Sequence, residues 1–170
     1  MDASTRFNNR LRYRPGDAAE QVHLTPAYVL EPVRCDLGGI GLDPCTTPEN
    51  PTGADVYYTV AEDGLLMPWQ TTNFFVNPPY GKAREPWVGR VLDAAESGLA
   101  GCLLMPAATD TRCFQRAARA AEAVVLVRGR LKFGVPRPNG RQVAASHPSA
   151  LFFYNARPVK TAALGLVVAS

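Results

Sequence analysis

Residues 73–81 read Asn-Phe-Phe-Val-Asn-Pro-Pro-Tyr-Gly. The apolar, aromatic run predicts a β-strand, and the two prolines stop it because proline cannot donate a hydrogen bond to a sheet ladder. The next residues therefore stand at the C-terminal end of a strand, where open α/β sheets bind ligands. Asn77 supplies an amide, and Pro78 and Pro79 supply carbonyl oxygens. With the flat ring of Tyr80 beside them, these groups predict a site that holds a planar amino group while its ring stacks on the tyrosine; an ordinary turn is the alternative.

Short apolar runs alternate with amphipathic segments through the rest of the chain. The runs predict strands at residues 39–45, 56–60, 101–105, 123–127, 150–154 and 164–169. Helices are predicted to start at Pro26 with Thr25 as N-cap, to span 87–97, and to run from Thr109 or Asp110 to about 121. This alternation predicts an α/β fold with a compact, mostly parallel sheet flanked by helices. Residues 132–146, with prolines and a glycine at their centre, are predicted to form a long loop.

The length and composition suit one globular domain. We place it at residues 22–170, behind a flexible basic arm at 1–21. No apolar run approaches the roughly 18 residues of a membrane span, so we expect a cytoplasmic protein. The four cysteines have no CxxC spacing and the chain holds only two histidines, so no metal site is predicted.

Basic residues concentrate between Arg112 and Arg141. The net charge is only +3, yet this segment holds eight basic residues against one acid, Glu122. Such an excess favours a polyanionic partner, because arginine and lysine make most phosphate contacts; a solvated surface is the alternative. The predicted nucleic-acid contacts are Arg112, Arg128, Arg130, Lys132, Arg137 and Arg141.

Two acidic residues stand close to predicted strand ends. Asp43 closes the strand at 39–45 and is followed by Pro44, and its carboxylate suits a ligand ammonium group. A simple turn cap is the alternative for Asp43. Asp63 lies fourteen positions before Asn77, within Asp63-Gly64-Leu65.

In combination these segments resemble the phage-type DNA adenine N6-methyltransferases. The resemblance covers roughly residues 24–154, and within it only the Asn-Pro-Pro-Tyr tetrapeptide is specific by itself. It rests on Leu24-Thr25-Pro26, Leu42-Asp43-Pro44-Cys45, Pro48-Glu49-Asn50, Tyr58-Thr59, Glu62-Asp63-Gly64-Leu65, Pro68-Trp69, Asn77-Pro78-Pro79-Tyr80-Gly81, Trp87-Val88, Pro106–Thr111 with Phe114, Gly129–Phe133 and Pro148-Ser149-Ala150.

The resemblance implies a Rossmann-like methyltransferase fold without a separate target-recognition domain, and a phage origin with a part in DNA methylation or restriction–modification. S-adenosylmethionine would be the methyl donor and N6 of adenine in double-stranded DNA the acceptor. Asn77 and the Pro78 carbonyl would accept hydrogen bonds from the amine of a flipped-out base, on which Tyr80 would stack; Pro79 completes the catalytic tetrapeptide. The implied cofactor contacts are Thr25, Pro26, Asp43, Pro44, Cys45, Asp63, Gly64, Leu65 and Asn77.

The chain departs from such sites in two respects. No Gly-x-Gly loop follows Asp43, and only twenty positions separate Asp43 from Asp63, too few for the usual helix, strand and second acidic residue that contacts the ribose. Glu62 and Asp55 both stay open as the ribose contact. Two other functions also stay open: methylation of another nitrogen, on an RNA base or a protein glutamine, and DNA binding by a catalytically silent relative.

Overall fold

The computed structural model describes residues 23–134 and 142–169, and its centre is a seven-stranded sheet. The strands lie in the order β2-β1-β3-β4-β8-β5-β9. Their bounds are β1 Leu42–Asp43, β2 Val56–Tyr57, β3 Asn73–Val76, β4 Ala100–Pro106, β5 Ala123–Val127, β8 Ser149–Tyr154 and β9 Gly165–Ala169.

One half of the sheet is parallel and the other half is antiparallel. β2, β1, β3 and β4 pair in parallel. β8 lies antiparallel between β4 and β5, and β9 pairs antiparallel with the other side of β5. The predicted α/β architecture is confirmed, and the parallel direction dominates because only β8 and β9 point the other way.

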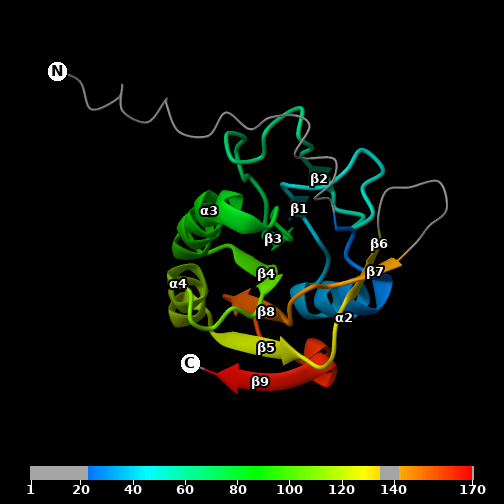
Figure 1. The fold of residues 1–170 in the computed structure, drawn as a ribbon. Coiled ribbons are helices and arrows are strands. Elements are labelled where there is room, and N and C mark those ends of the chain that lie inside the picture. Colours follow the sequence, from blue (N-terminus) through cyan, green and yellow to red (C-terminus); the bar gives the residue numbers. More distant parts are fainter. Residues whose placement is uncertain (1–22, 135–141, 170) are drawn as a thin grey trace.

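Helices cover both faces of this sheet (Figure 1). α2 (Ala27–Leu37) packs on one face, and α3 (Arg84–Glu96) and α4 (Arg112–Ala120) pack on the other. Alternate residues of β3 serve the two cores: Phe75 joins the cluster under α2, whereas Phe74 and Val76 join the cluster under α3 and α4. This two-sided burial explains why the strand reads as an unbroken apolar run.

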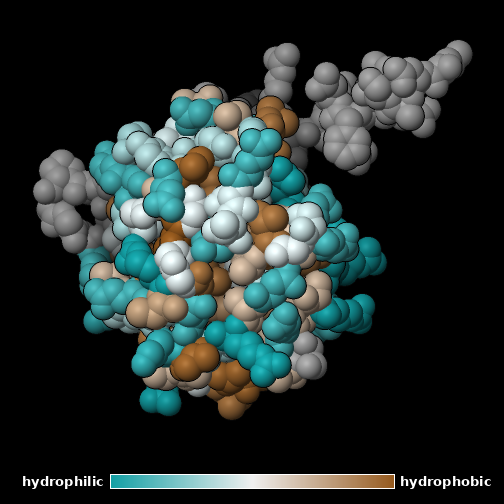
Figure 2. Space-filling model, turned by 180° about the vertical axis from the view of Figure 1, so that it is seen from behind, coloured by the Kyte–Doolittle hydropathy of each residue, from teal (hydrophilic) through white to brown (hydrophobic). Residues whose placement is uncertain are grey.

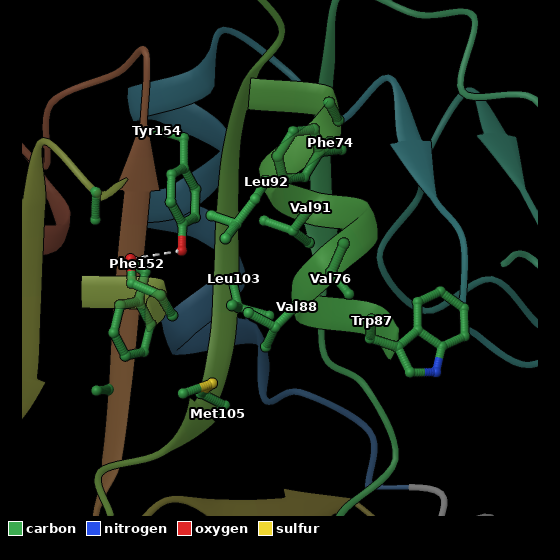
Figure 3. Packing of buried hydrophobic residues seen from close by; sticks show 14 of the residues in the cluster. Phe74, Val76, Trp87, Val88, Val91, Leu92, Leu103, Met105, Phe152 and Tyr154 are labelled. Atoms are coloured by element: carbon green, nitrogen blue, oxygen red, sulfur yellow. Dashed lines mark hydrogen bonds between the residues drawn. The ribbon is translucent and has the colours of Figure 1, made fainter. Parts of the chain in front are cut away.

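The core under α3 is built around aromatic rings (Figure 3). Trp87, Val88, Val91 and Leu92 of α3 are buried, as the helical spacing of these residues predicts. In Figure 3, Val88, Val91 and Leu92 point toward β4, whereas the Trp87 ring extends from the other side of the helix. Across the same core, the hydroxyl of Tyr154 donates a hydrogen bond to the carbonyl of Ala117 in α4, at 3.1 Å.

Gly101 of β4 lies opposite Phe74 of β3. A Cβ atom at position 101 would lie 2.1 Å from the Phe74 ring, so only glycine leaves room for that ring. A larger residue would displace β3, and with it the Asn-Pro-Pro-Tyr segment that follows.

Two helix starts differ from the sequence predictions. Pro26, not Thr25, is the N-cap of α2, and no side chain caps this helix; the Thr25 hydroxyl is engaged by the segment after β3. α4 is capped by Thr111, whose Oγ1 accepts a main-chain hydrogen bond from three residues on, at 3.2 Å. Thr109 and Asp110 were equally suitable by residue type, but the turn after β4 continues past both before the helix begins.

The prediction of a single loop at 132–146 is wrong. β6 (Lys132–Gly134) and β7 (Gln142–Ala144) form an antiparallel pair, and Leu24 bridges to Gly134. Strands of three residues carry too little alternation to be recognised beside prolines and glycines. Arg137 and Arg141, like the predicted arm at 1–21, lie outside the described residues.

The last strand leaves apolar side chains on the surface. Leu166, Val167 and Val168 of β9 are 65%, 39% and 48% exposed. Figure 2 shows hydrophobic side chains gathered at the lower end of the molecule, where β9 lies in Figure 1. In the part of the chain that the structure describes, no helix has the length and apolarity to cross a bilayer.

Candidate active site

The parallel strands β1, β3 and β4 end along one edge of the sheet, which we call the carboxyl edge. After β1 the chain forms β2 on one side of it and then crosses to form β3 on its other side. The carboxyl ends of β1 and β3 therefore form the topological switch point, the place where open α/β sheets bind ligands. Asp43 ends β1 and Asn77 follows β3, so both residues stand at the switch point.

The two polar atoms of the Asn77 side-chain amide differ in their hydrogen bonding. Its Nδ2 donates to the main-chain oxygen of His23 at 2.8 Å and to Oγ1 of Thr25 at 3.1 Å. Its Oδ1 is buried and accepts no hydrogen bond from any described residue. An unpartnered buried acceptor is costly, and in a native structure such groups are often completed by a ligand.

Aromatic rings surround Tyr80. His23 stacks on it, with ring centroids 4.9 Å apart and an interplanar angle of 17°. Phe133 stands edge-on to both rings, 5.3 Å from His23 and 6.2 Å from Tyr80, and the Arg84 guanidinium lies over the Tyr80 ring at 5.8 Å. Burial raises the pKa of Tyr80 to about 12, so its phenol is neutral.

His23 and Phe133 were missed by sequence reasoning. His23 stands next to the Leu-Thr-Pro motif and was not connected with Tyr80, because more than fifty residues separate them. Phe133 lies in the segment that was interpreted as a loop. The available signal was an aromatic residue in the Gly129–Phe133 motif, directly before Gly134.

Asp43 is only 3% exposed. One carboxylate oxygen accepts from Oγ1 of Thr52 at 2.9 Å and the other from the main-chain N of Cys45 at 3.2 Å. Loss of hydration raises the pKa of Asp43 to about 6 despite these hydrogen bonds. Within the described ranges, the one ion pair joins Arg116 to Glu85, so no cationic side chain there balances the Asp43 charge.

Cys45 links the segments that follow β1 and β3. Its Sγ donates to the main-chain oxygen of Asn77 at 3.4 Å. Burial and, secondarily, the Asp43 carboxylate raise the pKa of this thiol well above its ordinary value, so it remains a protonated donor.

The Asp63–Leu65 segment lies against the end of β1. A Cβ atom on Gly64 would lie 1.8 Å from the carbonyl oxygen of Pro44, so only glycine permits this approach. The indole Nε1 of Trp69 donates to the Gly64 carbonyl at 2.9 Å. Asp63 itself is exposed and its Oδ1 accepts from the main-chain N of Leu65 at 3.2 Å. The structure therefore brings Pro44 and Gly64 together and leaves the Asp63 carboxylate at the surface.

A family model described as DNA N-6-adenine-methyltransferase (Dam) matches residues 16–167, which is most of the chain. The chain belongs to this family. No curated protein gives a significant match. Membership implies DNA adenine N6-methyltransferase activity, and DNA as the substrate.

The two residues that could contact the cofactor ribose in such an enzyme, Asp55 and Glu62, lie at different ends of β2. Asp55 directly precedes β2, so it lies at the opposite end of that strand from the carboxyl edge. Glu62 follows β2, and its carboxylate accepts from the main-chain N and Oγ1 of Thr59 at 2.8 and 2.6 Å. These contacts hold the pKa of Glu62 below its ordinary value.

Basic side chains of this family member lie beside the carboxyl edge. Since β5 runs in the same direction as β4, the chain leaves β5 at that edge through Arg128, Arg130 and Lys132, all exposed. The Arg130 guanidinium donates to the main-chain oxygen of Ser146 at 2.6 Å. Arg112 is exposed at the start of α4 and lines an open cavity of about 500 Å³ with Gln115, Arg116, Arg119, Asp110, Leu92 and Ala120.

Proposed function

We propose that this protein transfers a methyl group from S-adenosylmethionine to N6 of an adenine flipped out of double-stranded DNA. The observation that carries the proposal is the buried Oδ1 of Asn77, an acceptor without a partner among the described residues at the switch point of the sheet. An exocyclic amine is the complementary group, because it brings two N–H donors and no competing negative charge.

Asn77 Oδ1 and the Pro78 carbonyl accept the two N–H groups of the adenine amine in this proposal. Two acceptors on one amino group draw the nitrogen lone pair out of conjugation with the ring and direct it toward the methyl donor. Catalysis then rests on positioning and electrostatics, with no covalent nucleophile on the protein. S-adenosylmethionine, when bound, would supply the electrophilic methyl group. Its sulfur would keep the electron pair of the broken S–CH₃ bond and leave as a neutral thioether, and the methylated nitrogen would release one proton to water.

The surroundings of Asp43, at the end of β1, suit the cofactor. A desolvated carboxylate without a cationic neighbour in the described residues favours a ligand ammonium group, such as that of the methionine moiety. The close approach of Gly64 to Pro44 would let main chain contact the ligand, with Cys45 and Leu65 alongside. We propose Asp63 and Pro26 as further contacts on the strength of the family resemblance; Thr25, which the resemblance also implies, contacts Asn77 instead.

DNA would approach the carboxyl edge. The base is proposed to stack on Tyr80, which requires that it use the face opposite His23 or displace the His23 ring. Arg112, Arg128, Arg130 and Lys132 are proposed to contact phosphates. Replacing Arg128, Arg130 and Lys132 with glutamine should lower the salt slope of duplex binding by up to about 3, near 0.9 per lost contact; an unchanged slope would remove these residues from the proposed interface.

The test of function offers the purified chain a methyl-labelled cofactor with unmethylated duplex DNA, single-stranded DNA, RNA and bacterial protein as separate acceptors. We expect label in duplex DNA, recovered as N6-methyladenine. Label in RNA or protein alone would show that the chain methylates another nitrogen, on an RNA base or a protein side chain. Cofactor binding without transfer would indicate a silent relative.

A matched pair of variants tests the site within the same assay. Asn77→Ala is expected to abolish transfer. Asn155→Ala is the control, because Asn155 Nδ2 also donates to two carbonyl oxygens, of Ala95 and Leu99, at 2.8 and 2.9 Å. Asn155 follows the antiparallel strand β8 and so lies at the opposite edge of the sheet. Equal loss in both variants would mean that the effect is on folding, not on the site.

A further inference from the structure

The amide of Asn77 has two orientations of nearly equal shape, and only one presents an acceptor to the substrate. In the observed orientation Nδ2 points to His23 O and Thr25 Oγ1, and Oδ1 is left over. A half-turn of the amide would exchange these atoms and aim N–H groups at the adenine amine, which is itself a donor. Whatever holds the amide therefore decides whether the site can bind an amine.

The partners of Nδ2 come from one short segment, His23–Thr25, more than fifty residues away in the chain. The carbonyl oxygen of His23 can only accept, so a flipped amide would place two acceptors 2.8 Å apart. Thr25 Oγ1 provides the second acceptor. A hydroxyl can also donate, so the His23 carbonyl selects the orientation of the amide and the Thr25 hydroxyl adds a second hydrogen bond that holds it. Thr25 is only 8% exposed, so water does not readily replace its hydroxyl.

The segment is held from two sides. The main-chain N and O of Leu24 exchange hydrogen bonds with Gly134 of β6, both at 2.9 Å. The His23 ring stacks on Tyr80 and meets the edge of Phe133. Leu24 also lies close to Gly134, where a Cβ atom would approach the Leu24 Cβ to 3.3 Å. The acceptors that face Asn77 thus belong to a fixed piece of backbone.

We infer that Thr25, together with the His23 carbonyl, is a positioning element that locks the catalytic amide with its oxygen toward the substrate. This rests on the proposed function of Asn77, and it assigns Thr25 a role through Asn77 and not through the cofactor. The Thr25 hydroxyl is used in this contact, and no side chain caps α2.

Thr25→Val tests the inference, since valine keeps the shape of the side chain and removes the acceptor. We expect kcat to fall by up to about 100-fold, as for a small misplacement of a catalytic group, with KM for cofactor and DNA changed by less than about threefold. Thr25→Ser restores the hydroxyl and should restore kcat. Thr161→Val is the matched control, because Thr161 is fully buried in η3 (Thr161–Leu164), with its hydroxyl unpartnered among the described residues.

Three outcomes would overturn the inference. They are a wild-type kcat in Thr25→Val, an equal loss of kcat in Thr25→Ser, or a rise in the cofactor KM with kcat unchanged. The last result would make Thr25 a cofactor contact. If the wild-type chain transferred no methyl group to any acceptor, the proposed function would fail, and the kinetic test with it.

A spectroscopic readout decides the inference in that case as well. The side-chain NH₂ signals of Asn77, assigned by their loss in Asn77→Asp, should exchange slowly with water in wild type and in Thr25→Ser. In Thr25→Val at least one of them should exchange faster, because one N–H has lost its buried acceptor. Identical exchange in Thr25→Val and wild type would contradict the positioning role without any reference to catalysis.

Discussion

The ends of β1 and β3 are neighbours with a similar sequence pattern and different chemistry. At each end a buried strand gives way to a polar residue and a proline: β1 ends at Asp43 before Pro44, and Asn77-Pro78 follows β3. Both oxygens of Asp43 accept hydrogen bonds, whereas Oδ1 of Asn77 accepts none from the described residues. Asp43 therefore offers a charge, and Asn77 offers one directed acceptor.

The partners of the two residues differ in origin. Cys45 and Thr52, which hold Asp43, lie two and nine residues away in the chain. His23 and Thr25, which hold Asn77, lie 54 and 52 residues away. The Asp43 environment is a local turn, and the Asn77 environment exists only after the segment before α2 has packed beside β3. We therefore expect substitutions at Asn77 to have larger effects than substitutions at Asp43.

Among the substitutions that compare the two strand ends, the largest effect is expected from Asn77→Asp, which keeps the shape of the side chain. The new oxygen would face the His23 carbonyl in place of a donor, so the contact becomes repulsive. Transfer should fall by about 10²–10³-fold, and the free energy of unfolding by about 1–3 kcal/mol. Single-turnover methylation and urea unfolding measure the two effects; near-wild-type transfer would show that the donor half of the amide is irrelevant.

A smaller effect is expected from Asp43→Asn, measured as calorimetric affinity for S-adenosylmethionine. Loss of the charge should weaken binding by roughly 10–100-fold near pH 7. An ammonium ligand favours the ionised carboxylate, whose pKa is about 6, so wild-type affinity should rise as the pH increases from about 5 to about 7. Asp43→Asn should lack this rise. The same rise in the variant would show that Asp43 does not bind the cofactor.

The same variant should be more stable than wild type without ligand. Because burial raises the pKa of Asp43 from 3.8 to about 6, the folded state binds its proton more tightly than the unfolded state does. The stabilisation by that proton is complete below about pH 4 and is lost as the pH rises through about 6. Asp43→Asn should thus gain up to about 3 kcal/mol at pH 8 and nothing near pH 4; equal stability at pH 8 would contradict the buried charge.

The smallest effect is expected from Thr52→Val. The Thr52 hydroxyl lowers the pKa of Asp43 against the larger effect of burial, so its removal should raise that pKa further. The pH at which cofactor affinity reaches half its maximum should move upward by up to about one pH unit. A midpoint that stayed in place, or moved downward, would mean that Thr52 does not hold the carboxylate in solution.

Much of the framework was predictable from short patterns. Proline after an apolar run predicted the ends of β1, β3 and β4, and helical spacing predicted α3 and its buried Trp87. Family membership, predicted from the motifs, is confirmed. The β6–β7 pair was missed because three-residue strands leave no periodic signal, and Thr111 was missed as a cap because several adjacent residues were equally suitable.

The chain alone establishes where β1, β3 and β4 stop, since proline and the buried apolar runs act over a few residues and need no distant partner. It also establishes that an amide and a carboxylate stand at two such stops. Which atom of that amide lacks a partner among the described residues is a matter of tertiary structure, because His23 and Thr25 reach the amide only through packing across the fold. Local sterics can be deduced from neighbouring residues, whereas the partners of a buried polar group depend on contacts between segments far apart in the chain.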